Sequence, residues 1–160
     1  MASEAQSLTL AELYSQALHL ERDIAARYRV YARRMREIGA TAVAEAFEKL
    51  ELEEQERSRA LAESPHGGNA GRRCPWEEVW ERAWASDASG QVDLIPSNPR
   101  QAILDALSAK KRAECFYIDV SDDAHSLAVR VCAAEFAVMD RRQMLKLQSM
   151  LAEQVSGIAA

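Results

Sequence analysis

The chain has 160 residues, of which 48% are hydrophobic and 28% charged, with 6 glycines and 4 prolines. This length suits one domain with a sizeable core, and the composition favours helix. The net charge of −5 argues against a nucleic-acid surface, because phosphate binding requires a basic patch. We therefore expect a single domain over residues 1–160 that does not bind nucleic acid.

The cysteines Cys74, Cys115 and Cys132 are scattered, and no two of them have the C-x-x-C spacing of a zinc site or a rubredoxin-type iron site. Free thiols are typical of a reducing compartment. The sequence begins MASEAQSL, without a charged-then-apolar signal pattern, and it has no apolar run long enough to span a bilayer. These features predict a soluble cytoplasmic protein that makes no membrane contact.

A first helix is predicted over about residues 9–38 and a second over about 41–63. Thr9 and Glu12 have the spacing of a capping box, and Gly39 can adopt the left-handed conformation that ends a helix. In both segments core-type positions recur at alternating steps of three and four, as in amphipathic helices. These positions are Tyr14, Ala17, Glu21, Ile24, Tyr28, Tyr31 and Met35 in the first, and Phe47, Leu50, Glu54, Arg57 and Leu61 in the second.

The connection that follows, residues 64–98, is long enough to travel the length of a helical bundle. A short helix is predicted within it over about residues 75–85, with Pro75 in its first turn. Trp76, Trp80 and Trp84 recur there at every fourth position and form one aromatic stripe. This stripe either seals the connection against the bundle or contacts a partner, since aromatic side chains often anchor interfaces.

Two further helices are predicted over about residues 99–123 and 126–155, with a turn near 124–126. Their core-type positions are Ala106, Lys110, Ala113, Tyr117 and Val120 in the third helix, and Val129, Ala133, Phe136, Asp140, Gln143, Leu147 and Met150 in the fourth. The predicted fold is therefore all-α, with two antiparallel helical hairpins joined by a long crossover. One crossover connection is the ferritin-like arrangement of a four-helix bundle.

Each of the four long predicted helices contains polar side chains on its core-facing side. They are Glu21 in the first, Glu54 and Arg57 in the second, Lys110 in the third, and Asp140 and Gln143 in the fourth. Their distances from the hairpin turns are similar, so in antiparallel helices they should lie at one height and form a single layer. Buried charge is unfavourable unless it is paired or bound to metal, so this layer is the candidate functional site.

The layer and its surroundings resemble the rubrerythrin-like branch of the ferritin-like di-iron proteins. The segment LERDIAARYRVYARRMREIGATAVAEAFEKLELEE looks like the first hairpin of that branch. AILDALSAKKRAECFY looks like the opening of its third helix, and LAVRVCAAEFAVMDRRQMLKLQSML like its fourth. The resemblance implies a bundle with a glutamate on each of two helices and a Glu-x-x-His motif on each of the other two, all pointing inward.

Several ligand positions of the family are altered here. Glu21 and Glu54 match two glutamates, and Asp140 replaces a third. At the two positions where the family has histidine this chain has Arg57 and Gln143, and at the remaining glutamate position it has Lys110. Rubrerythrin-like proteins generally use two irons to reduce peroxide or oxidise ferrous iron, and guanidinium and ammonium groups cannot ligate iron.

We therefore expect a salt-bridge network in place of the di-iron centre, with no cofactor and no catalytic residues. Three acids and two cations give the layer a predicted net charge of −1. Three alternatives remain open. Iron could still bind in a peroxidase- or ferroxidase-type oxidoreductase, or one hard cation could bind to Glu21, Glu54 and Asp140. Lys110 could instead be a catalytic lysine of depressed pKa, beside Tyr28 or Tyr117.

The predicted function is that of a non-catalytic scaffold or binding protein, and the resemblance implies a homodimer. His19, His66 and His125 are expected at the surface, where they cannot supply the missing ligands. Tyr28 and Tyr31 are expected in the core, with both hydroxyls reaching the polar layer.

Overall fold

The computed structural model describes residues 7–66 and 96–159. Within these two ranges the chain is all-helical, with no strand and with four helices. They are α1 (Leu10–Glu37), α2 (Thr41–Glu63), α4 (Pro99–Asp123) and α5 (Leu127–Ala159). The all-α prediction is confirmed for this part of the chain. The predicted helix over 75–85, Cys74, and the stripe of Trp76, Trp80 and Trp84 lie outside the described residues.

The helix ends follow the local signals in the sequence. Thr9 Oγ1 accepts a hydrogen bond from the Glu12 backbone N–H at 3.2 Å, and Glu12 Oε2 accepts one from the Thr9 N–H at 2.8 Å, which completes the capping box. Gly39 has φ +82°, a left-handed conformation that ends α1 without steric strain. Asn98 Oδ1 accepts from the Gln101 N–H at 2.9 Å and caps α4.

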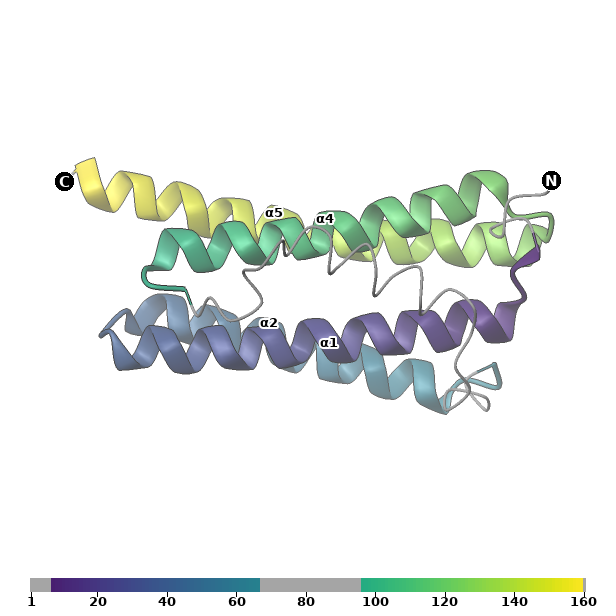
Figure 1. Cartoon of the computed structure of the whole chain (residues 1–160), viewed down its shortest axis with the longest axis horizontal. Helices are drawn as coiled ribbons and strands as arrows, with labels where there is room; N and C mark the ends of the chain where they lie inside the picture. The colour runs from purple at the N-terminus through teal and green to yellow at the C-terminus, as the bar shows by residue number, and fades with distance from the viewer. Residues whose placement is uncertain (1–6, 67–95, 160) are drawn as a thin grey trace.

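Figure 1 shows two antiparallel hairpins, one of α1 and α2 and one of α4 and α5, stacked along a common long axis. Helix α1 and helix α5 run in the same direction, as do α2 and α4. Glu63 ends α2 at one end of the bundle, while Pro99 begins α4 at the opposite end (Figure 1). The connection between them falls largely outside the described residues.

The core lies between the hairpins and is built from the predicted positions. The Phe47 ring packs against Tyr28 and Tyr31, with ring centroids 5.8 and 5.5 Å apart. In the second hairpin Tyr117 of α4 packs against Phe136 of α5, with ring centroids 5.4 Å apart. Nearly all the predicted core positions are buried, and Tyr14, Arg57 and Met150 are half-buried. None of the described helices is long and apolar enough to cross a membrane.

Candidate functional site: a buried ion-pair layer

The six polar residues predicted to share one height lie in the interior of the bundle. Glu21, Glu54, Lys110 and Asp140 have no exposed surface, and Gln143 is 4% exposed. The Arg57 side chain is 13% exposed and reaches the layer from α2 near the surface. We call these six residues the polar layer. All four described helices contribute to it, because antiparallel helices bring positions equally distant from their turns to the same level.

Lys110 Nζ lies between three carboxylates. It donates a hydrogen bond to Glu54 Oε1, in the closest contact of the layer, and a second to Asp140 Oδ1 at 2.9 Å. The same nitrogen lies 3.7 Å from Glu21 Oε2. An ammonium group has three donors, so this one side chain can interact with all three acids at once.

Arg57 forms a second cationic centre on the same acids. Its Nη1 donates to Asp140 Oδ1 at 3.1 Å and lies 3.7 Å from Glu54 Oε1. Its Nη2 lies 3.0 Å from Glu21 Oε1, an ion pair that lacks hydrogen-bond geometry. Because α2 supplies Arg57 and α5 supplies Asp140, this contact links the two hairpins.

Gln143 extends the layer on one side. Its Oε1 accepts a hydrogen bond from the Tyr28 hydroxyl at 3.1 Å, and its Nε2 donates to Glu53 Oε2 at 3.3 Å. Lys146 Nζ donates to Glu53 Oε1 at 2.6 Å at the surface. A chain of polar contacts therefore runs from the centre of the bundle to solvent, and each of its contacts joins the two hairpins.

The charges in the layer hold both cations in their protonated form. Burial opposes a charged ammonium, but Glu21, Glu54 and Asp140 outweigh it and raise the pKa of Lys110. Burial likewise opposes charge on Arg57, and the same three carboxylates raise its pKa. The hypothesis of a catalytic lysine with a depressed pKa is therefore wrong, because three anions surround the amine.

Burial has the opposite effect on the acids. Desolvation raises the pKa of Glu21 to about 8, against the lowering effect of Lys110, and the charge of Glu54 adds to the rise. Burial also raises the pKa of Asp140, although Lys110 opposes it. Glu21 therefore holds its proton to a higher pH than an exposed glutamate does.

The tyrosines around the layer differ from the prediction in one case. The Tyr28 hydroxyl reaches the layer through Gln143, as expected. The prediction for Tyr31 is wrong, because its hydroxyl instead accepts a hydrogen bond from Arg27 Nη1 at 3.3 Å, one helical turn away on α1. Tyr117 is completely buried, and burial, followed by the charges of Glu21 and Asp140, raises the pKa of its hydroxyl.

The three carboxylates could in principle hold a metal ion. Ligand atoms of Glu21, Glu54 and Asp140 all lie within 4.8 Å of one another, the one such group in residues 7–66 and 96–159. Lys110 occupies the point where their oxygens converge. A positive charge about 4 Å from another costs about 4 kcal/mol per unit charge at the effective dielectric of a protein. The residues present therefore do not fit a di-iron centre.

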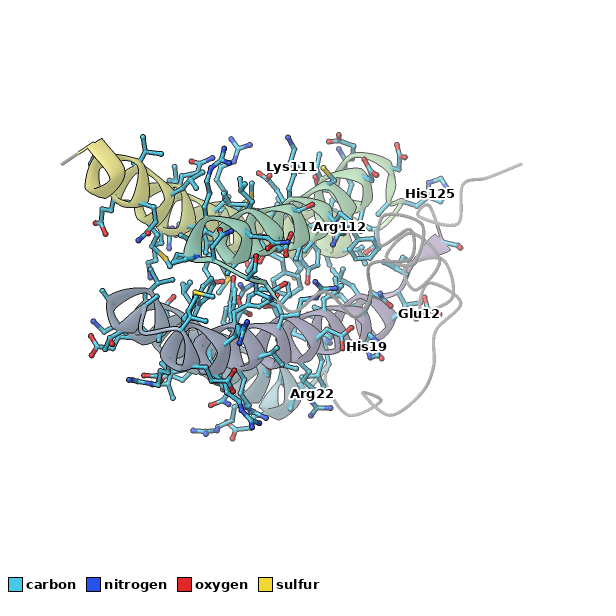
Figure 2. All side chains as sticks on the ribbon, turned by 60° about the vertical axis from the view of Figure 1, so that its left-hand side comes forward. Glu12, His19, Arg22, Lys111, Arg112 and His125 are labelled. Atoms are coloured by element: carbon cyan, nitrogen blue, oxygen red, sulfur yellow. The ribbon has the colours of Figure 1, made fainter. Side chains whose placement is uncertain are left out.

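The histidines do not complete the ligand set. His19 Nε2 lies 3.7 Å from Asp23 Oδ2 on an exposed part of α1, and the His66 ring packs on Tyr14 with centroids 5.3 Å apart. His125 lies in the exposed turn between α4 and α5. Figure 2 shows His19 and His125 at the periphery of the bundle. None of the three belongs to the group of converging acids.

Two features of the site had no clear signal in the sequence. Glu53 precedes Glu54 at a half-buried position, and it accepts hydrogen bonds from Gln143 and Lys146. Glu114 is nearly buried and accepts from Arg141 Nε at 2.6 Å on the next helix. Both acids lie next to core positions rather than on them, so helical periodicity alone does not identify them.

Comparison with protein families, characterised proteins and solved structures found no match for this chain.

Proposed function

We propose that this chain is a non-catalytic scaffold or binding protein, related to the rubrerythrin-like branch of the ferritin-like di-iron proteins. A network of salt bridges takes the place of the di-iron centre. The directions of the helices support the relationship: α1 and α5 are parallel, α2 and α4 are parallel, and α2 and α4 end and begin at opposite ends of the bundle (Figure 1). This order of directions is the one found in ferritin-like bundles, which have one long crossover.

One observation supports the proposal most strongly: Lys110 Nζ contacts all three acids that could bind a metal. Two protonated side chains, Lys110 and Arg57, supply the positive charge that the family obtains from metal ions. The acids retain their inward orientation because the cations neutralise them. The layer then has a structural role, joining α1 and α2 to α4 and α5 through buried ion pairs.

Measurement of bound metal tests this proposal. The protein is purified from cells grown with added iron and analysed by elemental mass spectrometry. We expect less than one tenth of an iron atom per chain. Stoichiometric iron, manganese or zinc that survives gel filtration would refute the proposal.

A constructive variant tests the origin of the layer. The triple substitution Arg57→His, Lys110→Glu and Gln143→His restores the ligand types that the resemblance implies. We expect this variant to bind iron that the parent does not bind. The matched control is Lys111→Glu, which changes the neighbouring exposed lysine and should leave iron binding absent.

A second candidate function is a metal-binding oxidoreductase of the peroxidase or ferroxidase type. The convergence of Glu21, Glu54 and Asp140 within 4.8 Å favours it. This alternative requires Lys110 to leave the acids, so that a hard cation can take its place. If this alternative holds, Lys110→Met should bind metal more tightly than the parent protein does. If the first proposal holds, Lys110→Met should still bind no metal, and only a variant with new ligands should gain a site.

A further inference from the structure

Helix α5 is apolar on two opposite faces. One face packs in the core through Val129, Ala133, Phe136 and Leu147. The other face is exposed, and its large apolar side chains are Leu127, Val131, Val138, Leu145 and Val155, each between 50% and 72% exposed. A helix with apolar residues on both faces is normally buried on both. The described residues of this chain cover only the first face.

The exposed face follows a heptad repeat. Positions 127, 131, 134, 138, 141, 145, 148, 152 and 155 alternate in steps of four and three, and all nine are exposed. Seven of them are apolar: Leu127, Val131, Ala134, Val138, Leu145, Ala152 and Val155. The polar members are Arg141 and Gln148. We call these nine positions the α5 seam. A repeat of 3.5 residues over four heptads is the pattern by which one helix packs along another in a coiled coil.

The corresponding exposed face of α4 provides a comparison. Its positions at the same spacing are Leu104, Ser108, Lys111, Cys115, Ile118 and Asp122. This face mixes polar and apolar residues, as expected for a helix that remains in contact with water. A continuous apolar seam is therefore present on the exposed face of α5 and absent from the corresponding face of α4.

We propose that the α5 seam is the contact between two copies of this chain, with the two α5 helices packed antiparallel. The favoured register places Val138 opposite Arg141 of the second copy, and Leu145 opposite Ala134. In the same register Leu127 lies opposite Ala152. Leu127 and Leu145 then each face an alanine, an arrangement that fills a helix interface without voids.

Charge also favours the antiparallel register. Glu135 and Arg142 are exposed beside the seam, and this register brings Glu135 of each copy next to Arg142 of the other. A parallel pair would place Arg141 against its own counterpart. Arg141 is instead bonded to Glu114 on α4 at 2.6 Å, which draws its guanidinium toward that helix.

The shape of the bundle is compatible with this contact. The carboxyl-terminal turns of α5 extend beyond the first turn of α4 (Figure 1). The seam is on the opposite side of α5 from the polar layer, so the proposed dimer does not depend on what the layer binds. Failure of the dimer would leave the metal-free proposal unaffected, and the reverse also holds.

The oligomeric state of the full chain tests the proposal. Light scattering coupled to gel filtration should give twice the mass of one chain for the parent protein. Leu145→Glu places a carboxylate against Ala134 of the second copy and should halve that mass, while circular dichroism stays unchanged because Leu145 is 59% exposed in the single chain. Leu52→Glu is the control, since Leu52 is 59% exposed on α2 and outside the seam.

Paired charge reversals test the register. Glu135→Arg and Arg142→Glu should each weaken the dimer at least tenfold in Kd, and the double variant should recover most of this loss. A parent protein that is monomeric at all concentrations would overturn the proposal, as would a dimer that persists in Leu145→Glu. Single reversals that weaken the dimer without recovery in the double variant would overturn the antiparallel register.

Discussion

Two ion pairs of this bundle have similar geometry and opposite surroundings. Arg36 donates to Glu48 at 2.6 and 2.8 Å, and the two side chains are 48% and 42% exposed. Lys110 donates to Asp140 at 2.9 Å, and neither side chain is exposed. Judged by donor–acceptor distance alone, the surface pair would be the stronger of the two. Solvation, and not distance, therefore decides how much each pair contributes to the stability of the fold.

The physical reason is the alternative available to each charge. If the surface pair separates, water solvates both ions, so the pair contributes little. If the buried pair loses one partner, the remaining charges stay in a medium of low dielectric with nothing to balance them.

The largest effect is expected from Lys110→Met. The substitution keeps the length of the side chain and removes the charge that contacts Glu21, Glu54 and Asp140. The free energy of unfolding should fall by about 3–5 kcal/mol in urea denaturation. Lys111→Met, at the adjacent exposed position, should change it by less than about 0.5 kcal/mol. Equal effects in the two variants would contradict a buried ionic role for Lys110.

The stability of the parent protein should fall as the pH rises from 5 to 8. Because the pKa of Glu21 is raised from 4.5 to about 8, the folded state binds a proton that the unfolded state has already released in this range. The stabilisation is therefore present at low pH and is lost as the pH approaches 8, by about 3 kcal/mol. The raised pKa of Asp140 acts in the same direction.

Glu21→Gln isolates this contribution. The amide imitates the protonated acid and cannot ionise, so the slope of stability against pH between 5 and 8 should be strongly reduced. The measurement is a series of urea denaturation curves at fixed ionic strength. An unchanged slope in Glu21→Gln would show that Glu21 is ionised in the folded state.

A smaller effect is expected from Tyr28→Phe. The Tyr28 hydroxyl donates to Gln143 Oε1 inside the bundle, so its removal leaves a buried acceptor without its donor and should cost about 1–2 kcal/mol. The matched control is Tyr31→Phe, whose hydroxyl bonds with Arg27 in a partly buried position on the same helix. The control should lose less stability than Tyr28→Phe. The reverse order would contradict a structural role for the contact between Tyr28 and Gln143.

The smallest effect is expected at the surface pair. Arg36→Gln removes both hydrogen bonds to Glu48 and should not change the unfolding midpoint beyond the error of the measurement in 0.5 M salt. The hydrogen bond from Arg36 lowers the pKa of Glu48, which NMR titration can follow, so the variant should return that pKa toward its ordinary value. A large loss of stability would remove the contrast with the buried pair.

Much of the fold could be predicted because helical signals are local. Three helix-end signals depend only on residues within one turn, and the structure has all three. They are the capping box at Thr9, the left-handed conformation of Gly39 and the proline at the start of α4, Pro99. The inward direction of Lys110 and Asp140 followed from a period of 3.6 residues. Tyr31 was misjudged because its neighbour Arg27, and not its position in the core, decides where the hydroxyl points.

The sequence alone determined which residues face inward and at what height, since helical period and distance from a turn are properties of the chain. Only the tertiary structure decided how the charges are shared. Lys110 contacts three acids from three other helices, and the pKa of Glu21 is raised because burial removes the water that would solvate its charge. The exposed second face of α5 likewise became recognisable only when the packed helices showed which side of it the core had left uncovered.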